Sequence, residues 1–285
     1  MGRNKPRKSA SNNDAVLDIV VTTAGRFDCL RTCLDTLSKI DTVLFNVFVI
    51  DNASPAEDLR TNLDIFENKV LYFEVKHLAQ NVGFPAAANE GARMGHAPLI
   101  MFLSDDVKLM DGAMDKIVSD FNDETIGIVG IKTLFPEDST SPIRPAGRVQ
   151  HCGLALNVRG EVIHPLVGWG RNNPKTCVTR MSNPDGSGLF AVTGACLTIR
   201  SKLFDKAGGF NSMYGKGTFE DTDLCLQVKR MGSRIMMDAE AQAYHYVGAT
   251  VEKRQEGFDL QGNFMMFRTK WANSGLYQWT EWEFW

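Results

Sequence analysis

LIMFLSDD, residues 99–106, is a run of five apolar residues that ends in a serine and two aspartates. A short apolar run closed by turn residues predicts a buried β-strand. Two neighbouring carboxylates at the end of such a strand repel each other unless a cation neutralises them. Oxygen ligands of this kind suit Mg²⁺ and Mn²⁺, so Asp105 and Asp106 are candidate metal ligands. The alternative is an acidic turn that caps the next helix and binds no metal.

Similar apolar runs alternate with helical patterns on both sides of this stretch. Leu30, Cys33, Leu34 and Leu37 have the spacing of one helix face. Strands are predicted at residues 16–22, 47–50, 70–75, 99–103 and 126–131, and helices at 30–37, 85–92 and 114–121. This alternation predicts an α/β fold in which parallel strands are buried on both faces.

The carboxyl ends of parallel strands lie at one edge of a sheet, and ligands bind in the crevice beyond that edge. The polar residues that directly follow the predicted strands are therefore expected to open onto one crevice. They are Thr22, Thr23, Asp51, Asn52, Ser104, Asp105 and Asp106.

The second half of the chain is less regular. From about residue 135 to 190, prolines and glycines interrupt the periodicity, and loops of this length are usually functional or disordered. Beyond it we expect a strand at 191–199, helices at 202–206 and 221–231, and a short strand at 234–237. One more helix face is marked by Leu260, Phe264, Phe267 and Trp271.

Two further candidate groups lie in this half. Phe219-Glu220-Asp221-Thr222-Asp223 opens the most regular helix, and a carboxylate held there can act as a general base. The helix macrodipole also favours acids at this position, which would need no catalytic role. His245 stands between two tyrosines, where a packed, hydrogen-bonded histidine is the alternative to a metal ligand.

Composition narrows the class of protein. The net charge of −3 provides no general attraction for nucleic acid or an anionic membrane. There is no apolar run of membrane-spanning length and no signal peptide, and the six cysteines are scattered, so we expect a reduced, cytoplasmic protein. Residues 1–14 are expected to form a disordered basic tail, either a solvated leader or an arm that contacts phosphates. The glycine spacings of NAD-type and P-loop sites do not occur.

Nine short stretches, taken in their order along residues 16–250, carry a family resemblance. They are IVVTT (19–23), VIDNAS (49–54), QNVGF to NEG (80–91), FLSDDV (102–107), VQHCG (149–153), TGAC (193–196), GGF (208–210), FEDTDL (219–224) and YHYVGAT (244–250). Together they resemble the inverting family 2 of glycosyltransferases, in particular its rhamnosyltransferase-like branch. The resemblance implies a GT-A fold, with a mostly parallel, Rossmann-like sheet flanked by helices. The single catalytic domain would cover residues 15–250, and residues 251–285 would add a C-terminal helix and an aromatic tail.

The resemblance also implies site residues. Asp106 would hold the metal with His245, and Asp105 is a second candidate because serine at position 104 departs from the family's D-x-D pattern. Thr22, Arg26 and Asp51 would contact the base and ribose of the nucleotide. The full set expected around the donor is Thr22, Thr23, Arg26, Asp51, Asn52, Asn81, Gly83, Asn89, Ser104, Asp105, Gly194 and Ala195.

The implied reaction is metal-dependent sugar transfer with inversion. Mn²⁺ or Mg²⁺ would stabilise the leaving diphosphate, and Asp221, with Glu220 beside it, would take the proton of the attacking hydroxyl. The donor would be a UDP-, dTDP- or GDP-linked hexose or deoxyhexose, and the acceptor a saccharide or other glycan. A hydroxylated base in DNA is a less favoured acceptor, motivated by the basic tail. A sugar nucleotidyltransferase is the alternative activity.

Two regions keep two interpretations each. Residues 135–190 fall where the fold places acceptor-facing elements, so they either contact the acceptor or form a surface excursion without contact. Their candidate contacts are Arg144, Arg148, His151, His164 and Trp169. The tryptophans of residues 278–285 either pack on the domain or form a homo-oligomer contact, or they make an exposed platform for stacking or for a membrane interface.

Overall fold

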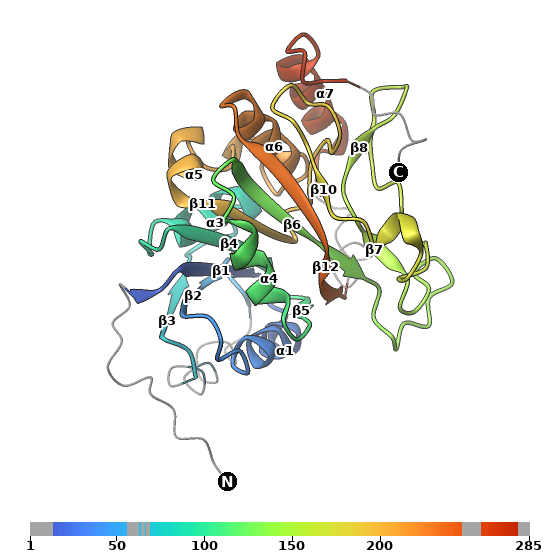
Figure 1. The fold of residues 1–285 in the computed structure, drawn as a ribbon. Coiled ribbons are helices and arrows are strands. Elements are labelled where there is room, and N and C mark those ends of the chain that lie inside the picture. The colour runs from blue at the N-terminus through green and yellow to red at the C-terminus, as the bar shows by residue number, and fades with distance from the viewer. Residues whose placement is uncertain (1–13, 56–62, 64–65, 67–68, 247–257, 279–285) are drawn as a thin grey trace.

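The computed structural model describes residues 14–55, 63, 66, 69–246 and 258–278, and its centre is a ten-stranded sheet (Figure 1). The order is β10-β12-β6-β11-β4-β1-β2-β3, with β5 paired to β12 and β7 paired to β6. The strands are β1 (Leu17–Thr23), β2 (Phe45–Asp51), β3 (Tyr72–His77), β4 (Leu99–Ser104), β5 (Val107–Leu109), β6 (Ile126–Leu134), β7 (Val149–His151), β10 (Arg180–Met181), β11 (Cys196–Arg200) and β12 (Arg234–His245). β8 (Ala155–Leu156) and β9 (Val162–Ile163) form a separate pair.

Six of the ten strands of the sheet run in one direction, namely β3, β2, β1, β4, β6 and β12. β3, β2, β1 and β4 run in one direction, and β6 and β12 are parallel to each other. β11 lies between β4 and β6 and is antiparallel to both. The chain enters β11 from the carboxyl edge, because Cys196 at its start pairs with Leu103 near the end of β4. The predicted α/β fold with a mostly parallel sheet is confirmed. β11 interrupts the row of parallel strands, and the short strands β5, β7 and β10 are antiparallel to the strands they pair with.

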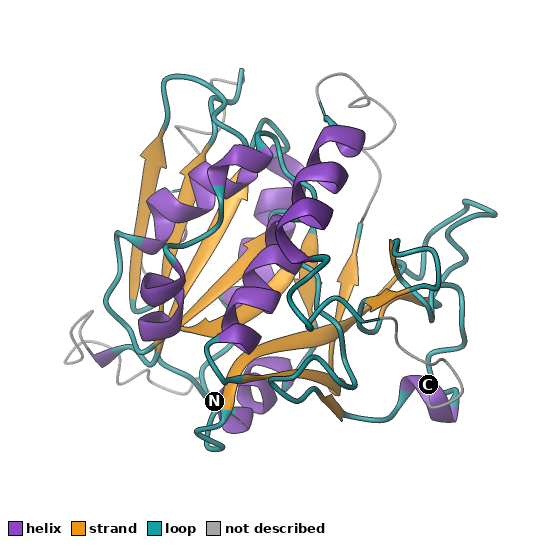
Figure 2. Ribbon diagram, turned by 90° about the horizontal axis from the view of Figure 1, so that it is seen from above, coloured by secondary structure: helices purple, strands orange, loops and turns teal. Residues whose placement is uncertain are grey.

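Helices cover both faces of the sheet (Figure 2). Successive side chains of a strand point to opposite faces, so β1 places Ile19 and Val21 in one apolar core and Val20 in another. The first core receives side chains from α1 (Phe27–Leu37) and α4 (Ala113–Asp120). The second receives them from α3 (Phe84–Ala92), α5 (Ser201–Ala207), α6 (Glu220–Arg230) and α7 (Leu260–Trp271).

β11 and β12 are the strands that differ most from their predicted bounds. β11 begins at Cys196 rather than at 191, because Ala191 forms an isolated bridge to Leu154 outside the strand. β12 continues to His245 rather than ending at 237. Its second half alternates alanines with polar residues, which is a weak apolar signal. The extension matters for function because it brings His245 to the carboxyl edge of the sheet.

The buried face of α7 also differs from the prediction. Leu260 is 61% exposed, whereas Asn263 is buried beside Phe267 and Trp271. The polar side chain of Asn263 is therefore part of the buried face of α7, whereas Leu260, which the apolar pattern placed there, is not.

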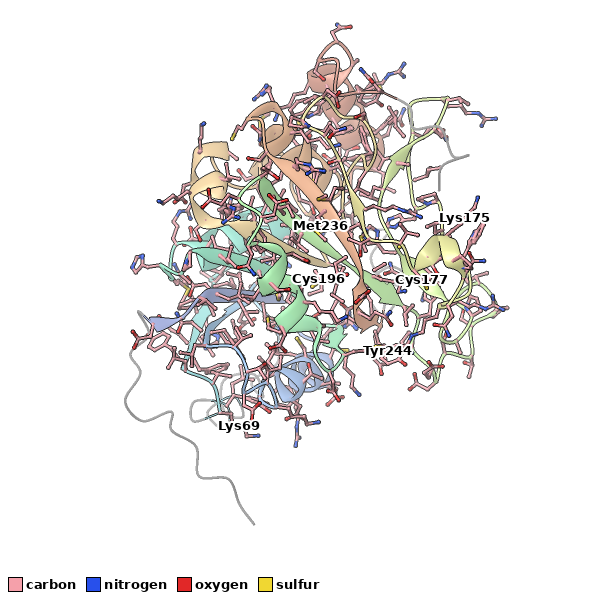
Figure 3. The ribbon with its side chains drawn as sticks, viewed as in Figure 1. Lys69, Lys175, Cys177, Cys196, Met236 and Tyr244 are labelled. Carbon is pink, nitrogen blue, oxygen red and sulfur yellow. The ribbon has the colours of Figure 1, made fainter. Side chains whose placement is uncertain are left out.

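The chain between β6 and β11 forms an excursion at one side of the sheet, where Figure 3 labels Lys175 and Cys177. It contains β7 to β10 and the 3-10 turn η4 (Pro174–Thr176). β7 pairs with β6 and β10 pairs with β12, so the excursion is tied to the sheet at two points.

Several expectations concern residues outside the described ranges. These are the basic tail up to residue 13, the boundary at 250/251, the end of the YHYVGAT stretch and the aromatic tail from residue 279. In the part of the chain that is described, no helix combines the length and apolar character needed to cross a bilayer. The six cysteines all lie in described segments and are free thiols.

Candidate functional site

A cavity of about 370 Å³ opens at the carboxyl edge of the sheet. This volume is within the range of small-molecule sites. Its walls come from the ends of β1, β2, β4 and β12, the start of α3 and the loop before α6. The lining residues are Thr22, Thr23, Ala24, Arg26, Asn52, Asn81, Gly83, Phe84, Ser104, Asp105, Asp106, Lys216, Gly217, Thr218, Glu220, His245 and Phe258.

The acidic pair after β4 is buried and fully engaged. Asp105 accepts a hydrogen bond from the Thr23 hydroxyl at 2.7 Å. Asp106 binds Arg26 through Oδ2 at 2.8 Å and lies 3.1 Å from His245 Nε2 through Oδ1. Burial alone would raise the pKa of Asp106, but His245 and then Arg26 outweigh it and hold that pKa well below its usual range. The carboxylate is therefore kept ionised and able to bind a cation.

Gln150 orients His245, the histidine that contacts Asp106. His245 Nδ1 lies 3.2 Å from Gln150 Oε1, and the Thr133 hydroxyl donates to the same oxygen. Because the Gln150 amide oxygen and the Asp106 carboxylate both only accept, His245 donates from Nδ1 to Gln150 and from Nε2 to Asp106; a bound metal would take the place of the Nε2 proton. A polar partner on the far nitrogen is the usual support of a metal-binding histidine.

Gln150→Leu is expected to weaken binding of Mn²⁺ with a nucleoside diphosphate by about 10- to 100-fold, because His245 loses its orienting acceptor. Titration of Mn²⁺ in the presence of UDP or GDP measures the change. Gln261→Leu on the exposed side of α7 is the matched control. An unchanged affinity in Gln150→Leu would mean that His245 needs no such support.

Asp221 and Glu220 begin α6 in different environments. Asp221 Oδ2 accepts the Gly194 amide at 2.8 Å, and its Oδ1 accepts the Thr222 amide at 2.6 Å. Glu220 is 7% exposed and lines the cavity. Burial, and next the charge of Asp221, raise the pKa of Glu220, so this residue retains a proton more readily than an exposed glutamate does.

The turn before these acids has a strained backbone. Thr218 and Phe219 both have positive φ angles, 82° and 70°, which side chains other than glycine rarely adopt. Each such residue costs on the order of 1–3 kcal/mol and persists only where its surroundings enforce it. The strain therefore has to be supported from outside the turn.

Helix α7 supplies that support. Asn263 donates to the Tyr214 and Gly217 carbonyls at 3.0 and 2.8 Å, and the ring of Phe267 stacks on Phe219 at 5.4 Å between centroids. Asp223 is fully buried and accepts the Trp271 indole N–H at 2.6 Å. Lys270 also binds Asp223, at 2.8 Å. Asp223, the last of the three acids in the FEDTD stretch, is therefore held by structural partners and does not line the cavity.

Trp271→Phe is expected to lower the free energy of unfolding by about 1.5–3 kcal/mol, because a buried carboxylate loses a hydrogen bond to a charged acceptor. Denaturant unfolding measures the loss. Trp169→Phe is the matched control, since Trp169 is 37% exposed. Equal stability of the two variants would show that the Trp271–Asp223 contact contributes little.

The loop before α3 contains a glycine, Gly83, at a position where no other residue fits. Gly83 has φ of +83°, and a Cβ added there would lie 1.9 Å from the Gly215 carbonyl oxygen. Asn52 Oδ1 accepts the Val82 amide at 2.8 Å, and Asn81 Oδ1 accepts from the Asn52 side chain at 3.1 Å. The loop before α3 therefore contacts the loop that leads to α6 with no side chain between them.

Three of the residues expected at the donor have other partners. Asp51 does not line the cavity, because His77 and the Ser54 amide occupy its carboxylate at 2.9 and 2.8 Å. Asn89 uses both ends of its amide on the backbone of Phe210. Arg26 lines the cavity and pairs with Asp106 at 2.8 Å.

Two more expected residues lie just behind the cavity. Gly194 donates to Asp221, and the Ala195 carbonyl accepts the Ser104 amide at 2.9 Å. They hold Asp221 and the turn that carries Ser104 in place and do not line the cavity themselves.

The excursion brings a histidine pair near Asp221. His151 is buried, and its Nε2 accepts the Gly153 and Thr193 amides at 3.3 Å each. Burial lowers the pKa of His151 well below its usual value, so the ring is neutral and Nδ1 carries its proton. That proton points to His164 Nδ1 at 3.1 Å. His164 accepts at Nδ1 and therefore carries its own proton on Nε2, and the residue is exposed to solvent. Desolvation of the ring lowers the pKa of His164, and the charge of Asp221 opposes that shift.

Sequence reasoning missed several residues of the site. Lys216, Thr218 and Phe258 line the cavity, and Gln150 and Asn263 support it from behind. Gln150 lies inside the quoted VQHCG stretch, but a neutral amide has no charge or metal-type spacing that marks it. The signal for Asn263 was its position, one turn before Phe267 on the buried face of a helix.

The side chains at this edge supply only part of the coordination that a divalent ion needs. Among the described residues, no three His, Cys, Asp or Glu side chains converge as a complete metal cluster. Asp106 and His245 nevertheless present an oxygen and a nitrogen 3.1 Å apart. Mg²⁺ and Mn²⁺ accept such partial sets when substrate phosphates complete the coordination. The residues fit an ion that binds together with a diphosphate.

Comparison with known proteins gives the family. The model of glycosyl transferase family 2 matches residues 18–208, which is most of the chain. The chain belongs to glycosyl transferase family 2. A relative, the O-antigen biosynthesis protein RfbC of Myxococcus xanthus, is 26% identical over 242 residues, covering 82% of this chain and 17% of RfbC. This family 2 chain thus spans less than a fifth of that relative's length.

Solved glycosyltransferases share the architecture of this family 2 chain. GalNAc-T7 with UDP, GalNAc and Mn²⁺ has a TM-score of 0.67 at 17% identity, over 92% of this chain and 49% of that one. The mannosyltransferase PcManGT from Pyrobaculum calidifontis, in complex with GDP-Man and Mn²⁺, has a TM-score of 0.58 at 15% identity, over 89% of this chain and 62% of that one. These likenesses show the fold, which is GT-A.

Proposed function

We propose that this family 2 glycosyltransferase is a metal-dependent, inverting enzyme that moves a hexose or deoxyhexose from a nucleoside diphosphate to a hydroxyl of a saccharide. The observation that carries the proposal is the composition of one cavity. Asp106 and His245 supply metal-type donors on one wall, and Glu220 supplies a carboxyl group on another, with Asp221 next to it in the chain just behind the lining. Diphosphate departure and hydroxyl activation need these two kinds of group.

Asp106 and His245 would hold the ion, with Asp105 held close by Thr23. When bound, a divalent cation supplies Lewis-acid stabilisation to a leaving diphosphate. Asp221 accepts the proton of the attacking hydroxyl while the Gly194 amide fixes its Oδ2. Glu220 retains its proton in the buried pair, which leaves the negative charge on Asp221. A single displacement assisted by one base inverts the anomeric carbon.

The donor is proposed to be a UDP-, GDP- or dTDP-sugar. UDP and GDP-Man are the nucleotides named with the two solved relatives. Within the family, the motif order keeps the rhamnosyltransferase-like branch as our preferred subgroup.

The acceptor is proposed to be a glycan. The relative named for O-antigen biosynthesis favours a saccharide over a base in DNA. The outward Nε2–H of His164, close to Asp221, is suited to a neighbouring hydroxyl of such an acceptor.

A screen of nucleotide sugars tests the proposal. UDP-, GDP- and dTDP-sugars are added with Mn²⁺, with Mg²⁺ or with EDTA, and thermal stability and donor hydrolysis are recorded. We expect one nucleotide class to raise Tm, because ligand binding adds RT ln(1 + [L]/Kd) to the free energy of unfolding. EDTA should abolish both the rise in Tm and the hydrolysis. A screen in which no nucleotide stabilises the protein under any metal condition would refute the proposal.

A further inference from the structure

Arg26 occupies the position from which a cation would approach the acidic pair. Its Nη1 lies 2.8 Å from Asp106 Oδ2 and 3.9 Å from Asp105 Oδ1. Its Nη2 donates to Cys29 Sγ at 2.9 Å. The Arg26 side chain is 14% exposed, so little water screens its charge. The guanidinium is thus a built-in countercharge of the two carboxylates.

This arrangement conflicts with tight binding of a free divalent ion. Both oxygens of Asp106 already have cationic or hydrogen-bonding partners, Arg26 on one and His245 on the other. An ion on Asp106 would stand a few ångströms from a permanently charged guanidinium, in a buried place where like charges repel strongly. The ion and Arg26 therefore compete for one carboxylate.

A diphosphate removes that conflict. Arg26 lines the same cavity as Asp106, and guanidinium groups bind phosphate oxygens in bidentate fashion. A diphosphate in the cavity offers negative charge both to the ion and to the arginine, so Arg26 can exchange its carboxylate partner for a phosphate.

We propose that Arg26 is a positioning residue that opposes the divalent ion at Asp106 until a nucleoside diphosphate draws its guanidinium away. The inference rests on the proposed function and adds to it a dependence of metal binding on the nucleotide. The ion binds weakly alone and tightly with the nucleotide, and by thermodynamic reciprocity the nucleotide binds tightly only with the ion. Hydrolysis of donor without metal is thereby disfavoured by the protein's own charge.

Binding of Mn²⁺ alone tests the proposal, followed by the electron paramagnetic resonance signal of the free ion. We expect Arg26→Gln to bind Mn²⁺ about 5- to 150-fold more tightly than the unmodified protein, and to gain less when UDP or GDP is added. Arg31→Gln, at an exposed position of the helix α1 that Arg26 precedes, should behave as the unmodified protein does. Adding Asp106→Asn to Arg26→Gln should abolish the gained affinity.

Arg26→Lys keeps the charge and provides a second variant that preserves the ion pair. It should bind Mn²⁺ alone as weakly as the unmodified protein. Equal Mn²⁺ affinity of Arg26→Gln and the unmodified protein would overturn the inference, as would tight binding by Arg26→Lys. If none of these proteins binds Mn²⁺ with any nucleoside diphosphate, the metal-dependent function itself fails, which is a different result.

Discussion

Asp221→Asn is expected to lower the rate of sugar transfer by about 10²- to 10⁴-fold, the usual contribution of a general base. The amide keeps the shape of the side chain, and its oxygen can still accept the Gly194 N–H, while its NH2 group gives up the hydrogen bond from the Thr222 amide. It cannot take a proton from a hydroxyl. Donor binding should therefore remain near normal, because Asp221 does not line the cavity.

Initial rates and nucleotide-induced thermal stabilisation measure the two effects separately. Asp205→Asn, on the exposed side of α5, is the matched control for a change from aspartate to asparagine. Turnover close to that of the control would remove Asp221 from the role of base. A loss of donor binding equal to the loss of rate would instead indicate a structural role.

Asp106→Asn is expected to abolish metal-dependent donor binding and to reduce turnover by about 10²-fold or more, since a metal's contribution to charge stabilisation amounts to several kcal/mol. The variant loses the negative charge that unites Arg26 and His245. Asp105→Asn should have a smaller effect, because an amide oxygen at 105 still accepts the Thr23 hydroxyl.

Mn²⁺ titration with UDP or GDP and initial rates at saturating metal compare the two variants. The ranking of Asp106 above Asp105 is the informative outcome. If Asp105→Asn is the more damaging change, the ion is held chiefly by Asp105, and the Arg26–Asp106 pair is a structural contact.

The fold was largely predictable because its strands are unbroken apolar runs, and LIMFLSDD alone marks both a buried strand and its polar end. β12 was underestimated because alanines alternating with polar residues bury little surface per residue. The antiparallel direction of β11 depends on where the excursion returns the chain to the sheet, and no local pattern records that.

The site was predictable where residues follow strands. Thr22, Asn52 and Asp106 share one cavity because parallel strands end at one edge. The roles of Asp51 and Asn89 could not be predicted, because His77 and Phe210 lie far from them in the sequence and occupy their polar groups. Gln150 was missed for the same reason, because its role is to orient a histidine that lies 95 residues away in the sequence.

The contact between Asp223 and Trp271 has a consequence for the time at which activity appears during protein synthesis. Domains generally fold as units while the chain emerges from the ribosome. The strained turn before Asp221 is supported by Asn263, Phe267 and Trp271, which are translated about 50 residues later than the turn itself. A nascent chain can therefore form the carboxyl edge of the first parallel strands before it has the partners of this turn. The turn before Asp221 gains the contacts of α7 only after residue 271 has left the exit tunnel.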